Sequence, residues 1–474
     1  MTPLVILRRS PQWLTHRPTI ATTVVVAIAS VIGLLISRGS WLTLVILLIP
    51  LAVALAIGLS VNMLAALLAI AAMFQIPLVG VGGPFDLGLT EIVVPSILAL
   101  MVMQRLVASH PGYLSDVHGS TPGRLPRAIH LAVGAYGLVL ILNLVRSKYV
   151  MATPVPVNHA FYEYLVVAIG TYAAACICFT SPDFDWRRFL GFLYYLALIV
   201  CIVGLVSLIL HLSLNLGNPR YSVRSTTSGA VRIGFLDTFG LVGFALAVTA
   251  GGRLRSLSSL LFLAALVASG GRSVLVGALI AAAIYLVATR RSWQLVAAVS
   301  LAVLLALLIP TIRKSAQAER LSQVNPATFA KDRRQFLYDS ALDSLSQRPV
   351  LGTGVGAPVS LVGLEPELAE FYEMQLELGG HATYATLLKN LGLLGLLPFL
   401  AALALGLTRC LSLKKAEPAV GFFLIVMIAK AISMIVEGAG ADPLYFMALA
   451  GAASVSISGL PQSAAVSDEV RFAR

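Results

Sequence analysis

Runs of mostly apolar residues follow one another along almost the whole chain, with short polar segments between them. A run of about 20 such residues is long enough to cross a membrane as a helix, and the pattern predicts about 12–14 spans. The chain is therefore expected to be an all-α polytopic membrane protein. The spans are expected at residues 20–37, 41–58, 59–78, 88–108, 128–146, 159–179, 188–211, 234–251, 255–270, 273–289, 293–310, 383–408, 419–437 and 443–460.

One polar segment, residues 311–382, is much longer than the others. It separates an N-terminal transmembrane bundle, residues 1–310, from C-terminal transmembrane helices with a short tail, residues 383–474. No internal repeat is visible in the sequence. We therefore expect two helical parts joined by one large loop.

Basic residues predict the orientation, because cytoplasmic loops of membrane proteins are enriched in lysine and arginine. With the N-terminus in the cytoplasm, the long loop lies on the outer side of the membrane. Each inner segment long enough to count then contains basic residues: Arg8/Arg9/Arg17, Arg124/Arg127, Arg187/Arg188, Arg253/Arg255, Arg290/Arg291, Lys414/Lys415 and Arg471/Arg474.

Composition agrees with a membrane protein and changes the interpretation of the charge. Hydrophobic residues make up 58% of the chain and charged residues 11%, whereas about 25% of residues in a soluble domain are charged. The formal net charge of +12 is explained by inner loops that face anionic membrane lipids, so no nucleic-acid partner is expected. The four cysteines have no metal-ligand spacing and are expected to be buried thiols.

Several arginines fall on the expected outer side, against the charge bias of membrane proteins: Arg220, Arg224, Arg232 and Arg272. Either they extend to lipid phosphates or they bind an anionic ligand. The planar guanidinium suits phosphate oxygens, and several together would stabilise a pyrophosphate leaving group.

His381 stands where the helix over 383–408 is expected to begin. The N-terminus of a helix disfavours imidazolium, which would keep the ring neutral and able to act as a general base. Alternatively, His381 caps the helix or contacts lipid headgroups. No metal or cofactor is expected, because the sequence has no metal-spaced histidine pair. The glycine-rich segment 352–356 lacks a βαβ context and is interpreted as a tight turn that permits close backbone approach.

Four short motifs lie in order along this part of the chain. They are a Ser-x-x-Arg turn, an arginine four residues before an aromatic and an Ala-Leu pair, a Pro-x-Leu-Gly-x-Gly turn, and a histidine followed by a Tyr and a Leu-Gly-x-x-Gly helix. They stand at 269–272, 334–342, 348–354 and 381–395. Together they resemble the O-antigen ligase/polymerase superfamily of bacterial inner membranes, over roughly residues 232–408.

This resemblance implies a metal-independent, inverting glycosyltransferase of the bacterial inner membrane with a periplasmic catalytic loop. The donor would be a glycan on undecaprenyl pyrophosphate, and the acceptor a glycan, a lipid or lipid A-core. By the same resemblance, His381 matches the essential histidine, and Arg272 and Arg334 match donor-binding arginines. Further candidates for the donor site are Arg232, Arg224, Arg333 and Lys389; Lys389 either contacts phosphate or pairs with a neighbouring acid.

The sequence departs from the family pattern at two positions. Ala382 follows the histidine where the family usually has Asn, and Asn390 precedes Leu391 where it often has an acidic residue. These changes leave the acceptor open. Ligase and polymerase activities also remain open, as do the donor sugar, the oligomeric state and other polysaccharide-assembly proteins as partners.

A lipid-linked oligosaccharide flippase or other transporter is the alternative from another class. Transporters usually show repeat symmetry and charges at mid-membrane. Here Lys430 is the clear basic residue inside an expected span, and the polar residues gather in one loop. This asymmetry favours an enzyme.

Overall fold

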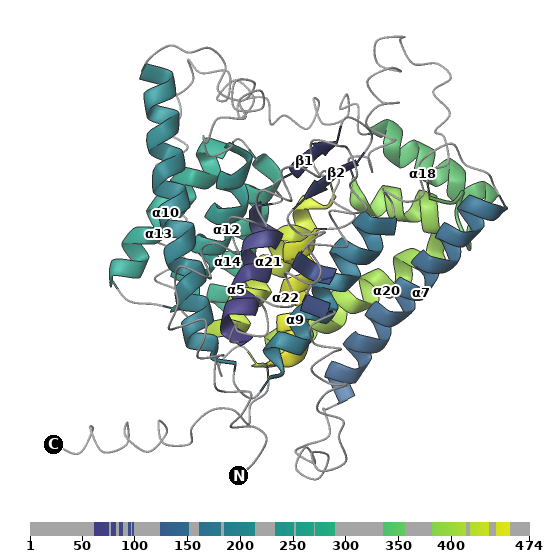
Figure 1. The fold of residues 1–474 in the computed structure, drawn as a ribbon, viewed down its shortest axis with the longest axis horizontal. Helices are drawn as coiled ribbons and strands as arrows, with labels where there is room; N and C mark the ends of the chain where they lie inside the picture. Colours follow the sequence, from purple (N-terminus) through teal and green to yellow (C-terminus); the bar gives the residue numbers. More distant parts are fainter. Residues whose placement is uncertain are drawn as a thin grey trace, which may run out of the picture.

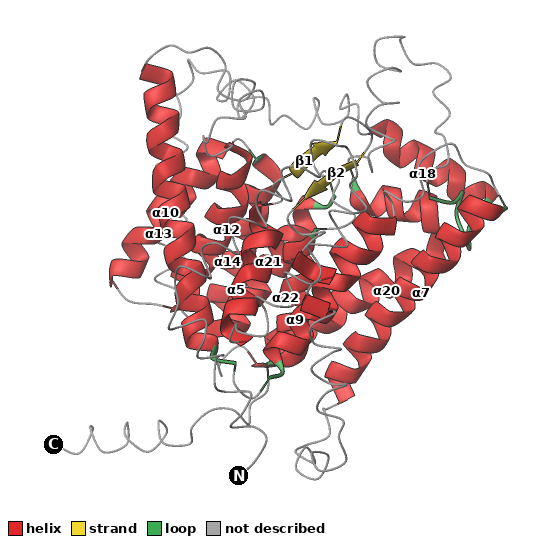
Figure 2. Ribbon diagram, in the orientation of Figure 1, coloured by secondary structure: helices red, strands yellow, loops and turns green. Residues whose placement is uncertain are grey.

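The computed structural model describes residues 61–74, 77–81, 85–88, 93–95, 97–98, 124–150, 161–181, 184–213, 233–250, 253–269, 271–289, 335–355, 382–413, 418–435 and 442–455. In these ranges the chain is mostly helical, with one short two-stranded hairpin and a few short loops and turns (Figure 2). The expected spans at 20–37, 41–58 and 293–310 lie outside the described residues.

The described elements follow the expected order of spans closely, and the predicted helical membrane fold is confirmed. Each helix coincides with an expected span except α18, which lies inside the expected long loop. In chain order the elements are α5 (Val61–Phe74), β1 (Pro77–Val81), β2 (Phe85–Gly88), α7 (Arg124–Tyr149), η1 (Phe161–Gly170), α9 (Thr171–Phe179), α10 (Trp186–Ser213), α12 (Ile233–Ala250), α13 (Arg253–Ser269), α14 (Arg272–Ala288), α18 (Gln335–Gln347), α20 (Thr383–Leu413), α21 (Pro418–Ser433) and α22 (Pro443–Ser454) (Figure 1).

The hairpin was not expected from the sequence. β1 and β2 pair antiparallel, with Val81 opposite Phe85 and Gly80 opposite Asp86. The sequence between the strands is Gly82-Gly83-Pro84, a composition typical of tight turns rather than of helices. The hairpin therefore lies between α5 and the next apolar segment, at the junction of the expected spans 59–78 and 88–108.

Three of the described helices are long and apolar enough to cross a membrane by length and composition: Leu125–Ser147, Trp186–Val206 and Thr383–Leu413. The other apolar helices in the described ranges have 10–17 residues. Many side chains on the long helices are exposed and apolar, among them Leu131, Leu138, Tyr195 and Leu397. Such surfaces suit a lipid environment.

α21 lies at the centre of the bundle. Its residues from Phe422 to Met427 are fully buried around the whole circumference of the helix, which is typical of a helix enclosed by others. α12, α14, α20 and α22 pack against it. In Figure 1, α10 and α13 lie on the left of this centre, and α7 runs beside α20 on the right.

Candidate functional site

The C-terminal end of α21 is the point where the candidate catalytic segments meet. We call residues 430–435 the anchor turn. The backbone N–H of Thr383, the first residue of α20, donates to the carbonyl of Met434 at 3.0 Å. The hydroxyl of Tyr338, in the first turn of α18, donates to the next carbonyl, that of Ile435. The starts of two helices that are separate in sequence are therefore held on adjacent carbonyl groups.

These two helix starts directly follow predicted site residues. Arg334 immediately precedes α18, and His381 stands two residues before Thr383. Tyr384 adds a third bond, because its hydroxyl donates to the carbonyl of Ala431 at 3.0 Å. Of the predicted residues, five lie outside the described ranges: Arg224, Arg232, Arg333, Arg334 and His381.

α14, which begins at Arg272, runs antiparallel to α21 in close contact. A Cβ atom on Gly277 would stand 2.6 Å from the carbonyl oxygen of Ala429, and one on Gly421 would stand 2.6 Å from the ring of Tyr285. The two contacts share one register, since both helices rise about 1.5 Å per residue. Extrapolated by five residues in each helix at this rise, the register predicts that the backbone of Arg272 is level with Met434 in the anchor turn.

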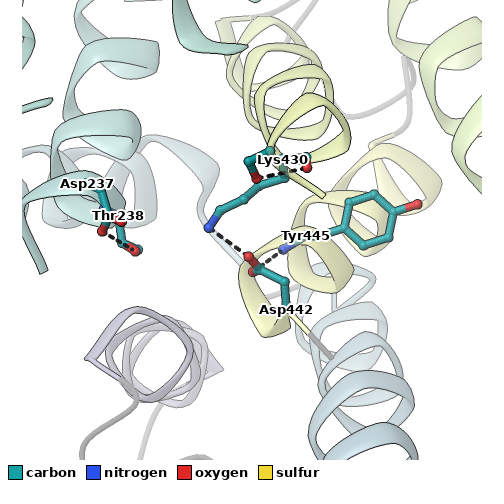
Figure 3. A network of polar contacts seen from close by, with 6 residues as sticks. Asp237, Thr238, Lys430, Asp442 and Tyr445 are labelled. Carbon is teal, nitrogen blue, oxygen red and sulfur yellow. Dashed lines mark hydrogen bonds and ion pairs between the residues drawn. The ribbon is translucent and has the colours of Figure 1, made fainter. Parts of the chain in front are cut away.

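A buried ion pair joins the anchor turn to α22. Lys430 Nζ lies 2.7 Å from Asp442 Oδ2, and both side chains are largely buried. Asp442 also caps α22, since its Oδ1 accepts the backbone N–H of Tyr445 at 3.1 Å (Figure 3). The sequence showed Lys430 as a basic residue inside an expected span, but only the fold shows that Asp442 is its partner. Buried charges need such partners to offset the loss of hydration.

A second carboxylate lies on α12, near the start of α14. Asp237 Oδ1 accepts the backbone N–H of Thr238 at 2.6 Å (Figure 3). Its Oδ2 lies 3.6 Å from the position a Cβ atom would take on Gly271, the N-cap residue of α14. A carboxylate beside a helix N-terminus is electrostatically favoured. Asp237 is therefore adjacent to the segment that contains Arg272, a relation that sequence spacing does not show.

α20 is broken at Gly392, where φ is 64° and ψ is −162°. We call residues 383–391 the first leg and residues 393–413 the second leg. The span expected over 383–408 is therefore present, but it consists of two helical parts. This backbone conformation is essentially restricted to glycine, so the break is a property of the sequence at this one position.

A turn from the expected loop fills the break. We call residues 349–354 the glycine turn; Gly352 and Gly354 have φ of 63° and 94°. Its N–H groups at Thr353 and Gly354 donate to the carbonyls of Lys389 and Asn390. In return, its carbonyls at 349 and 350 accept the N–H groups of residues 393 and 394. Four backbone hydrogen bonds thus satisfy groups that the break leaves without intrahelical partners.

The two glycines at this junction touch one another. A Cβ atom on Gly352 would stand 2.5 Å from the carbonyl oxygen of Lys389, and one on Gly392 would stand 2.4 Å from that of Val350. No side chain has room between these backbones. The prediction that the glycine-rich segment forms a tight turn permitting close backbone approach is confirmed.

α18 packs on the first leg through small residues. Ala341, Ala382 and Ala385 form a small buried cluster, with Tyr338 and Leu388 against it. Ala382 has φ of 71°, a conformation that asparagine adopts more readily than other non-glycine residues. The departure from the family pattern noted above therefore falls on a position with an unusual backbone.

The charged groups of the described site are few. Lys389 lies half-buried in the first leg, and its carbonyl also accepts the hydroxyl of Thr353 at 3.0 Å; a phosphate contact through its ammonium stays a prediction. Within the described ranges, no three His, Cys, Asp or Glu residues lie close enough to hold a metal ion. The three cysteines Cys178, Cys201 and Cys410 are buried, as predicted, and Cys176 is partly buried.

Comparison with known proteins agrees with this geometry. No curated protein matches the chain. Residues 257–400 match the model of the Wzy_C family, described as O-antigen ligase. That segment contains α14, α18, the glycine turn and the break in α20. The matched segment confirms the resemblance to the O-antigen ligase superfamily that the motifs predicted.

Proposed function

We propose that this membrane enzyme of the O-antigen ligase/polymerase family is an inverting glycosyltransferase. It moves a glycan from undecaprenyl pyrophosphate to an acceptor hydroxyl at the periplasmic face of the inner membrane. The proposal rests on one observation above all. The helix starts that follow Arg334 and His381 are bonded to adjacent carbonyls of the anchor turn, and α14 begins at the same level.

Arg272 and Arg334 hold the pyrophosphate of the donor in this proposal. Their fixed charges stabilise the negative charge that develops on the leaving group as the glycosidic bond breaks. The common level of the starts of α14 and α18 supports this pairing. Additional donor contacts are assigned to Arg232, Arg224, Arg333 and Lys389.

His381 is the proposed general base. It removes the proton from the acceptor hydroxyl while that oxygen forms its bond to the anomeric carbon. The bond from this carbon to the pyrophosphate oxygen breaks at the opposite face, and its electron pair leaves with undecaprenyl pyrophosphate. The configuration at the anomeric carbon is inverted. Because His381 lies directly ahead of the first leg, the orientation of that leg determines where the base acts.

A reconstitution experiment tests the proposal. The purified protein in liposomes is incubated with undecaprenyl-pyrophosphate oligosaccharide, candidate acceptors and EDTA. We expect product from the wild type, and a loss of about 100-fold or more for His381→Ala, as is typical for removal of a general base. Arg272→Ala should also lose activity, whereas Arg127→Ala, an exposed arginine on α7, should not.

The form of the product separates the remaining alternatives. A ladder of lengthening glycans indicates a polymerase, and a single transfer to a lipid acceptor indicates a ligase. Full activity of folded His381→Ala would refute the catalytic assignment. Movement of the intact carrier across the liposome membrane without product would instead support a transporter.

A further inference from the structure

We propose that Arg146 on α7 is a positioning residue for transfer: it ties the glycine turn to α7 and thereby sets the orientation of the first leg of α20. Arg146 lies outside the segment that matches the family, residues 257–400. The inference rests on the proposed function, because it assigns the role through the base that precedes the first leg. It is separable from that function by experiment.

The guanidinium of Arg146 binds the glycine turn through main-chain oxygens. Its Nη1 lies 3.1 Å from the carbonyl oxygen of Leu351 and 3.2 Å from that of Gly352. The same nitrogen lies 3.4 Å from Oδ1 of Asn143, one helical turn earlier on α7. Bonds from a charged donor are stronger than those between neutral groups. A side chain more than 200 residues away in sequence thus holds the centre of the turn.

The break at Gly392 makes this contact relevant to the candidate base. A continuous helix would set the direction of its first residues by its own hydrogen bonds, but the first leg ends at the break. Its last carbonyls, at Lys389 and Asn390, are bonded to the glycine turn instead. The second leg packs against α7, where the ring of Phe399 contacts that of Tyr136. The turn therefore connects the two legs of α20. We call the turn and the break together the joint, and Arg146 links this joint to α7.

Loss of Arg146 should shift the first leg more than it lowers the stability of the fold. The four backbone bonds between turn and break do not involve its side chain, so the joint itself persists without it. The first leg is about 13 Å long, and a tilt of about 5° would move its far end by about 1 Å. A displacement of about 1 Å in a reacting group can cost about 100-fold in rate.

Steady-state kinetics in the reconstituted system provide the first test. We expect Arg146→Met to lower kcat by about 10- to 100-fold, with KM for the donor changed by no more than about 2-fold. Arg146→Lys keeps a cationic donor and should recover part of kcat. Arg127→Met removes an exposed arginine from the other end of the same helix and should behave as wild type.

Hydrogen–deuterium exchange gives a readout that does not depend on activity. In Arg146→Met, exchange should rise in residues 349–354 and in the first leg, and remain unchanged in α12 and α21. Unchanged exchange in the turn would refute the contact, whatever happens to kcat. Faster exchange with wild-type kcat would refute the positioning role. If the wild type itself forms no product, the proposed function fails, and exchange alone still decides whether Arg146 holds the turn.

Discussion

At the scale of single residues, Lys430 and Asp442 form a buried ion pair that is costly to break. Each is buried, and each is the other's counter-ion. Removing one partner leaves an uncompensated charge, which costs about 3–5 kcal/mol, whereas replacing both with uncharged residues is often neutral. The pair also helps to position the site, because it joins the anchor turn to the start of α22.

We expect Asp442→Asn to lower the free energy of unfolding by about 3–5 kcal/mol, although asparagine retains an oxygen for the cap. The double variant Lys430→Met/Asp442→Asn should recover most of that loss. Denaturant unfolding in detergent measures both. Asp185→Asn is the matched control: Asp185 also caps a helix and contacts a basic residue, Arg188, but this pair is exposed. Its change should stay within about 1 kcal/mol. A double variant no more stable than the single would contradict the pairing argument.

At the scale of elements, the break in α20 is the feature that shapes the candidate site. A bundle needs only straight helices to bury its apolar faces, so the break is not required for packing. It gives the first leg a direction of its own, and the glycine turn and α18 hold that leg against the anchor turn. The two positive-φ glycines that meet there, Gly352 and Gly392, make this arrangement possible.

Gly392→Ala should damage this joint. Alanine is disfavoured at φ of 64° and ψ of −162°, and its Cβ would meet the carbonyl of Val350. We expect a loss of about 2 kcal/mol or more in the free energy of unfolding, together with loss of transfer activity. Gly134→Ala in α7, where a Cβ would have open space, should be neutral or stabilising by up to about 1 kcal/mol. Equal thermal stability of the two variants would show that the backbone at position 392 does not require glycine.

At the scale of the whole molecule, the site requires that the starts of α14, α18 and α20 lie on the periplasmic side. Single-cysteine labelling with a membrane-impermeant maleimide tests this orientation in intact cells. Val350→Cys, in the exposed part of the glycine turn, should be labelled from outside. Arg187→Cys, in a predicted cytoplasmic loop, should be labelled only after the membrane is opened. The reverse pattern would place the proposed site in the cytoplasm and exclude the proposed donor geometry.

Local sequence was sufficient to predict the apolar helices, the family resemblance and the tight glycine turn. Apolar runs need burial or lipid wherever they occur, so α7, α10, α20 and α21 followed from hydropathy alone. The glycine turn was predictable for a similar reason, because only glycine accepts its backbone angles. The hairpin at β1 and β2 was missed, since its strands lie where two apolar runs, assigned to helices over 59–78 and 88–108, come close together.

Tertiary structure alone decided which residues are partners. Nothing in the spacing of Lys430 and Asp442, or of Arg146 and Leu351, indicates that they touch. Hydrophobicity is non-directional, so an apolar pattern determines that helices pack but not their register or neighbours. Those depend on close approaches such as Gly277 against Ala429. The sequence by itself thus determined a helical membrane enzyme and its candidate residues, while the fold determined that the segments following Arg334 and His381 meet at the anchor turn.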